Sequence, residues 1–199
     1  MDSPSPSWFR TNDSQTMSDL HKCIDAELAT WIGNQPVFFV GTAPLLADGH
    51  VNLSPKGGDS FRVIGPMEVI YQDYTGSGAE TAAHLRENGR IVIMFCAFEG
   101  PPRILRLHGT GTVMTPSNPR FAELAKHFPI NLGTRSVVHV TVRRVTTSCG
   151  YAVPTMEFTS RRDALDKWAN AKGPDKLKDY RTQKNQLSIG GLPAFDQEL

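Results

Sequence analysis

The sequence predicts an α+β protein built on an antiparallel β-barrel that carries helices at its periphery. The expected strands follow one another with one helix inserted, without the regular β-α alternation of a doubly wound sheet. Segments rich in Gly and Pro separate these strands, as at the corners of a small barrel. The chain has 199 residues, of which 39% are hydrophobic and 21% are charged. This size and composition suit one core that needs no disulfide or metal.

The charge balance argues against a partner of strong opposite charge. Lys and Arg total 21 against 20 Asp and Glu, for a formal net charge of +1, so we expect neither nucleic-acid binding nor attraction to an anionic membrane. No apolar run approaches the ~18 residues of a membrane span, and the N-terminus lacks the features of a signal peptide. The three cysteines, Cys23, Cys96 and Cys149, show no CxxC spacing. They are typical of reduced thiols and predict a cytoplasmic location.

The N-terminal half is expected to contain two helices and three strands. Residues 1–16 are expected to form a disordered tail, as an extension ahead of a start at Met17. Apolar residues at three- to four-residue spacing then predict a helix from Ser18 to Ile32, with Ser18 or Asp19 as its cap. The further elements expected in this half are strands at 37–42 and 51–54 joined by an Asp48-Gly49 turn, a loop at 55–66, a strand at 67–74, and a helix from Gly78 to Asn88 that ends at Gly89.

The C-terminal half is expected to contain three more strands followed by helix. The strands lie at 90–95, 104–114 and 136–147, a short helix lies at 119–127, and residues 159–184 are helical with Leu165, Trp168, Leu177 and Tyr180 as apolar anchors. Along 136–147, Val alternates with polar residues, which is typical of a half-buried strand. We therefore expect a barrel over residues 17–157 and a C-terminal helical segment, 158–199, packed on it.

The most informative segment for function runs from Tyr71 to Thr81. A strand ends there in a turn of small residues that leads into a helix, and the N–H groups of a helix N-terminus can hold an anion. Thr75, Ser77 and Thr81 would add hydroxyl donors. The spacing of Ser77 and Glu80 also fits a capping box that needs no ligand, so both interpretations stay open.

A second candidate anion site is the sequence Asn52-Leu53-Ser54-Pro55-Lys56-Gly57-Gly58. Its glycine and lysine spacing differs from that of a Walker loop, but it places a hydroxyl and an ammonium group just beyond a strand. The alternative is an exposed turn with a solubilising lysine. Two weak anion sites on neighbouring strands would reinforce each other.

Other polar groups are less distinctive. Arg106 and His108 share one face of a predicted strand, where Arg106 could bind a phosphate or form part of a polar surface. The histidines lack ligand spacing, so no metal site is expected, and no nucleophile–base pair is evident. Residues 161–184 hold eight Lys/Arg and four Asp, and this mixture favours a solvated helix face over a nucleic-acid site.

Several blocks of the sequence together resemble the pyridoxamine 5′-phosphate oxidase-like family of FMN-binding split barrels. The blocks that carry the resemblance are Val51–Gly57, Asp73–Leu85, Asn88–Ile91, Arg106–Gly111, Cys149–Pro154 and Ser188–Pro193. The resemblance spans roughly residues 20–195. It implies a six-stranded antiparallel split β-barrel with peripheral helices that forms a homodimer, with FMN at the subunit interface.

The resemblance also implies which residues contact the cofactor. The expected FMN-binding residues are Asn52, Leu53, Ser54, Pro55, Lys56, Tyr74, Thr75, Ser77, Gly78, Ala79, Thr81 and Arg106. Lys56 and Arg106 would neutralise the FMN phosphate, the hydroxyl groups would donate hydrogen bonds, and Gly78 and Ala79 would offer backbone N–H groups. No catalytic acid or base is assigned, because the flavin itself supplies the redox chemistry.

Two departures from the family pattern bear on activity. Glu80 and Thr81 stand where true pyridoxamine phosphate oxidases have a basic pair, and Gly190 stands where relatives often have Asp. The resemblance therefore implies an FMN-dependent oxidoreductase that acts on an unidentified small molecule rather than an enzyme of vitamin B6. A non-catalytic flavin binder or sensor, or a reductase that uses a deazaflavin, are the alternatives.

Overall fold

The computed structural model describes residues 18–129 and 131–196, so the predicted tail at 1–16 lies outside the described residues. The described elements are β1 (Ser18–His21), α1 (Ala26–Gly33), β2 (Val37–Thr42), β3 (Asn52–Gly57), β4 (Phe61–Gly65), β5 (Glu68–Tyr74), α2 (Glu80–Asn88), β6 (Arg90–Cys96), β7 (Ile104–Met114), α3 (Phe121–Ala125), β8 (Thr134–Ser148) and α4 (Ala164–Lys184).

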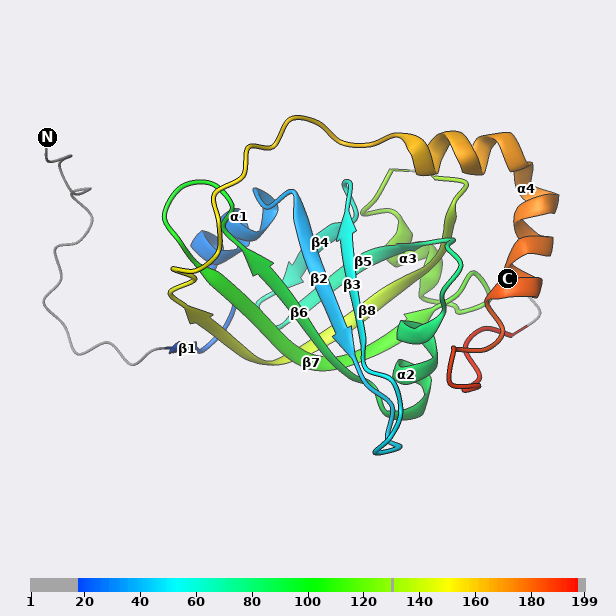
Figure 1. Cartoon of the computed structure of the whole chain (residues 1–199), viewed down its shortest axis with the longest axis horizontal. Coiled ribbons are helices and arrows are strands. Elements are labelled where there is room, and N and C mark those ends of the chain that lie inside the picture. The colour runs from blue at the N-terminus through cyan, green and yellow to red at the C-terminus, as the bar shows by residue number, and fades with distance from the viewer. Residues whose placement is uncertain (1–17, 130, 197–199) are drawn as a thin grey trace, which may run out of the picture.

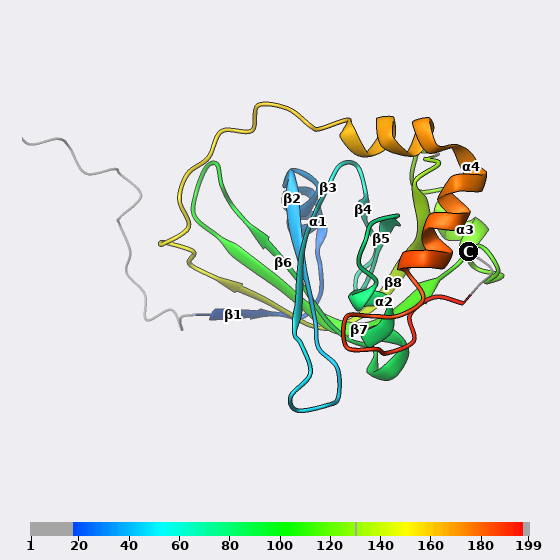
Figure 2. The same cartoon turned by 45° about the vertical axis from the view of Figure 1, so that its right-hand side comes forward.

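One curled antiparallel sheet forms the body of the molecule (Figure 1). Its strand order is β3-β2-β6-β7-β8-β5-β4, and β1 pairs with the end of β8. Helices α2 and α4 gather at the end of the sheet where β5 and β8 lie (Figure 2). This confirms an α+β fold based on an antiparallel split barrel, although the sheet has eight strands rather than six.

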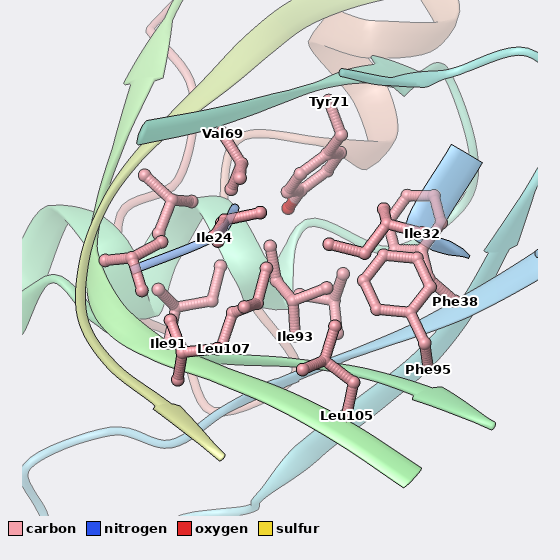
Figure 3. Close-up of a cluster of buried hydrophobic side chains, with 14 of the residues drawn as sticks. Ile24, Ile32, Phe38, Val69, Tyr71, Ile91, Ile93, Phe95, Leu105 and Leu107 are labelled. Carbon is pink, nitrogen blue, oxygen red and sulfur yellow. The ribbon is translucent and has the colours of Figure 1, made fainter. Parts of the chain in front are cut away.

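The concave side of the sheet encloses the main hydrophobic core (Figure 3). Side chains from five strands and α1 meet there, among them Phe38, Tyr71, Ile93, Leu105 and Leu107. These five are at most 3% exposed. Because apolar burial is the dominant stabilising term in folding, this cluster fixes which face of each strand points inward.

The predicted helix over Ser18–Ile32 is wrong in its first part. Ser18–His21 forms β1, which pairs with β8, and the helix begins only at Ala26. Asp25, rather than Ser18 or Asp19, is the N-cap, because its Oδ1 accepts a hydrogen bond of 2.8 Å from the N–H of Leu28. The helix ends at Gly33, one residue beyond the predicted Ile32.

The predicted loop at 55–66 is also wrong, because most of it belongs to strands. β3 continues through Pro55 to Gly57, and Phe61–Gly65 forms β4, which pairs with β5. Both β3 and β4 end the strand order. An edge strand tolerates a proline such as Pro55 because one of its sides needs no ladder hydrogen bond.

The remaining helices agree with the sequence in place but not always in length. α2 ends at Asn88 as predicted, and the C-cap Gly89 has a left-handed φ of 70°. The predicted helix at 119–127 shortens to α3. α4 is interrupted at Gly173, followed by Pro174, so two helical pieces meet at a kink. Residues 149–163 form a strap that arches from the end of β8 to α4 (Figure 1).

Candidate functional site

Three polar residues of β3 point into the concave side of the sheet. In the β2–β3 register, Asn52, Ser54 and Lys56 lie opposite Thr42, Val40 and Phe38, which are all buried. Directly opposed residues in an antiparallel pair face the same side of the sheet. Leu53 and Pro55, which the sequence also assigned to the site, therefore point to the other face, where both are exposed.

Asn52 joins β3 to the first turn of α2. Its Nδ2 lies 3.0 Å from Oγ1 of Thr81 and 3.2 Å from Oγ1 of Thr42, and its Oδ1 accepts from Oγ of Ser54 at 3.0 Å. Thr42 also lies 3.0 Å from Nδ1 of His84. The structure thus brings together Asn52, Ser54 and Thr81, which the sequence placed in two separate blocks.

Lys56 takes part in a buried charge cluster that spans the sheet interior. Its Nζ lies 3.1 Å from Oδ1 of Asp73 on β5, and Nε of Arg135 on β8 lies 2.7 Å from Oδ2 of the same carboxylate. The side chains of Asp73 and Arg135 are only 5% and 6% exposed. Burial alone would raise the pKa of Asp73, but the two cations outweigh it and hold this pKa well below its ordinary value.

The turn after β5 presents the N-terminus of α2 as predicted, but without a capping box. Ala79 is the N-cap and makes no side-chain cap, whereas Oε1 of Glu80 accepts a hydrogen bond from the N–H of Ile189. The capping-box interpretation is therefore wrong, because the C-terminal segment occupies the carboxylate. Ser77 is exposed, so its hydroxyl is accessible.

Thr75 and Tyr74, which were predicted to contact FMN, form hydrogen bonds within the protein. Thr75 is 1% exposed, and both its N–H and its hydroxyl donate to the carbonyl of Gly133. Tyr74 donates from its hydroxyl to Gln72. Thr75 thus anchors the turn to the segment before β8, whereas the hydrogen bond of Tyr74 stays within β5.

Three residues that the sequence did not single out complete the environment of the turn. Nη1 of Arg135 donates to the carbonyl of Gly78, Nε of Arg181 donates to Oγ1 of Thr75, and Nδ2 of Asn185 donates to the carbonyl of Gly76. Burial and the neighbouring Arg135 both lower the pKa of Arg181. Only the fold brings these residues to the turn, so no local pattern could have identified them.

Arg106 lies apart from the other predicted residues. It alternates along β7 with the buried, core-facing Leu105 and Leu107, so it projects from the opposite face of the sheet. There its Nη1 donates to Oγ of Ser148 at 3.1 Å. Within one chain, the structure does not bring Arg106 to Lys56.

Two kinds of site are not seen in the part of the chain that the structure describes. No group of three or more His, Cys, Asp or Glu side chains there is arranged to hold a metal ion. Among the same residues, no helix combines the length and hydropathy needed to cross a membrane.

The comparison with known proteins agrees with this geometry. Residues 24–149 match the family model described as pyridoxamine 5′-phosphate oxidase. The chain belongs to the pyridoxamine 5′-phosphate oxidase family. The matched region begins just before α1, ends after β8, and contains both β3 and the turn that leads into α2.

Individual relatives are similar to different extents. The pyridoxamine 5′-phosphate oxidase family protein ustO of Aspergillus flavus is 38% identical, over 92% of this chain and 80% of the relative. A crystal structure of a variant of HupZ from Group A Streptococcus is similar with a TM-score of 0.50 and 26% identity, over 62% of this chain and 98% of HupZ. A second HupZ structure gives a TM-score of 0.48 and 27% identity, over 61% of this chain and 91% of that one.

His84 is expected to make stability depend on pH. Burial lowers the pKa of this histidine below its ordinary value of 6.5. Because the unfolded chain then takes up the proton more readily, the free energy of unfolding should fall as the pH drops below about 6.5. Chemical unfolding at about pH 7.5 and about pH 5.5 would measure this loss. It should be smaller in His84→Asn, whose amide oxygen can replace Nδ1 as a partner of Thr42.

The pKa of His108 is lowered as well, by burial and by Arg106 and Arg144, so His108→Gln is the matched control. That variant should keep the part of the pH dependence that belongs to His84. An identical pH dependence in the wild type and His84→Asn would contradict the assignment.

Proposed function

We propose that this protein is an FMN-dependent oxidoreductase that acts on a small molecule. The observation that carries the proposal is the arrangement of Asn52, Ser54 and Lys56 on the inner face of β3, directly across from the N-terminus of α2. Thr81, in the first turn of α2, is already hydrogen-bonded to Asn52. Membership of the pyridoxamine 5′-phosphate oxidase family supports the choice of a flavin mononucleotide over other phosphorylated ligands.

The donors present fit a phosphate monoester. A helix N-terminus leaves its first N–H groups without intrahelical acceptors, and here the N-cap Ala79 supplies no side chain to satisfy them. The hydroxyls of Ser77 and Thr81 lie beside these groups in the sequence, and Lys56 supplies a cation. The carboxylate of Asp73 pairs with both Lys56 and Arg135, so these three side chains together carry one net positive charge. This charge can attract the phosphate.

Each residue of the proposed site then has a distinct role in binding FMN. Lys56 binds by charge, Ser54 and Thr81 orient the ligand through their hydroxyls, and Asn52 keeps β3 and α2 at a fixed separation. Arg135 and Thr75 hold the turn itself. When bound, FMN would supply the electron-transfer chemistry, so the residues of the chain need only bind, orient and shield it.

We further propose that the active form is a homodimer with FMN at the subunit interface. Four large apolar side chains, Leu45, Leu46, Val51 and Leu53, are exposed in and beside the connection between β2 and β3. Clustered exposed apolar side chains are typical of interaction surfaces. Arg106, on the face of the sheet away from the core, would then reach a phosphate only in the partner's site. The three free cysteines support a cytoplasmic location.

The test is direct. Purified protein should be yellow, with flavin absorbance bands, and mass analysis of the released cofactor should give FMN. Protein that is colourless and gains no thermal stability with added FMN would refute the proposal. If FMN binds but no electron donor or acceptor reacts with the complex, the chain is a flavin binder and the enzymatic part of the proposal is wrong.

A further inference from the structure

A large cavity lies beneath the strap formed by residues 149–163, outside the polar cluster described above. Its volume is about 990 Å³, and three segments distant in the sequence line it: residues 27–37 at α1 and the start of β2, residues 98–103 between β6 and β7, and residues 156–161 of the strap. This volume is at the upper end of the range of small-molecule sites, which is about 300–1,000 Å³.

The strap is tied to the segment between β6 and β7 by two hydrogen bonds. The N–H of Met156 donates to the carbonyl of Phe98, and the N–H of Phe158 donates to Oε1 of Glu99, both at 2.9 Å. Despite this anchoring, the side chains of Met156 and Phe158 remain 55% and 48% exposed. Large apolar side chains that line a cavity while still accessible to water are suited to covering a ligand.

Trp31 and Arg103 form the most ordered wall of the cavity. Trp31 packs edge-on against the buried Phe95, with ring centroids 6.5 Å apart, and the guanidinium carbon of Arg103 lies 5.6 Å from the Trp31 ring. The backbone of Arg103 is held by a hydrogen bond from the N–H of Ala97. Within residues 18–129 and 131–196, no hydrogen bond or ion pair engages the Arg103 guanidinium, so its planar fork of donors is available to an anion.

The acidic residues of the cavity do not cancel this charge. Glu27, Glu99 and Glu157 are all exposed, so water screens their charges, and Arg161 adds a second cation to the lining. Arg103 is partly buried, and a charge acts more strongly where less water surrounds it.

The cavity borders the end of β3, next to Lys56. Val37, which lines the cavity, is the direct partner of Gly57 in the β2–β3 ladder, and Lys56 is the next residue. The carbonyl of Pro36 lies 3.4 Å from the point where a side chain on Gly57 would begin. Lys56 pairs with the buried Phe38 and faces the concave side, whereas Val37 and Gly57 alternate with them and face the other side.

We propose that this cavity is a second small-molecule site and that its ligand is a planar aromatic acid. Its ring would lie among Trp31, Phe98 and Phe158, and its carboxylate would accept a bidentate hydrogen bond from Arg103. This site is separate from the proposed flavin site, so binding of the acid does not require FMN.

Calorimetric titration with 2-naphthoate and with 2-naphthamide tests this inference, because the two probes share a shape and differ in charge. The wild-type protein should bind 2-naphthoate more tightly than the amide. Arg103→Gln should weaken 2-naphthoate binding about tenfold and leave 2-naphthamide binding unchanged. Phe158→Ala should weaken both probes. Arg143→Gln, an exposed arginine on β8, is the matched control and should change neither.

FMN retention, followed by absorbance in the same samples, separates this inference from the proposed function. Failure of 2-naphthoate to bind, or equal affinities for both probes, overturns the inference even if FMN binds. Charge-dependent binding of 2-naphthoate by protein that takes up no FMN supports the cavity and refutes the flavin function.

Discussion

Replacing Asp73 with Asn is expected to lower the free energy of unfolding by about 3–5 kcal/mol, because it leaves a buried guanidinium without its counter-charge. The Asp73 carboxylate lies between Lys56 and Arg135, and the side chain of Arg135 is only 6% exposed. Urea denaturation measures this loss.

The exposed pair of Asp59 and Arg62 provides the control. Its Asp59 side chain is 47% exposed, so Asp59→Asn should cost less than about 1 kcal/mol. The pH dependence adds a check on Asp73. Folding lowers the pKa of Asp73. Its contribution to the free energy of unfolding is therefore present above the pKa of about 3.9 that Asp has in the unfolded chain, and it is lost as the pH falls below that value. An unfolding free energy equal to that of Asp59→Asn would show that the buried cluster contributes little.

The second large effect is expected at Lys56. Changing Lys56 to Gln should raise the Kd for FMN about 10- to 100-fold, because a charge-assisted contact to the phosphate is lost. Riboflavin carries the same ring system without the phosphate, so its affinity should change much less. Quenching of flavin fluorescence measures both affinities.

Lys126→Gln is the matched substitution, since Lys126 is exposed at the end of α3. It should leave both flavin affinities at their wild-type values. If Lys56→Gln weakens riboflavin as much as FMN, Lys56 acts on the ring or on the fold rather than on the phosphate, and its assigned role is wrong.

Elements with a clear local pattern were predictable from the sequence. The alternating Val residues of β8 and the left-handed Gly89 after α2 both depend on neighbours close in the chain. β1 and β4 were missed because pairing with distant strands, rather than local propensity, makes Ser18–His21 and Phe61–Gly65 extended.

The residues of the candidate site also fall into those that the sequence predicted and those that only the fold revealed. Asn52, Ser54, Lys56 and Thr81 stood out from the sequence because they occur in short, polar, glycine-rich blocks. Arg135, Arg181 and Asn185 lie roughly 60 to 110 residues from the turn that they contact, and residues around Arg181 resembled a solvated helix face. Their roles depend on tertiary packing, which no local spacing encodes.

The contacts from α4 and the C-terminal segment to the turn before α2 also concern the order of events during synthesis. Arg181, Asn185 and Ile189 are made about a hundred residues after Thr75, Gly76 and Glu80, to which they bind. Because synthesis proceeds from the N-terminus, every strand up to Ser148 emerges from the ribosome before these three residues. The turn therefore acquires its final support only after α4 and the segment that follows it have emerged.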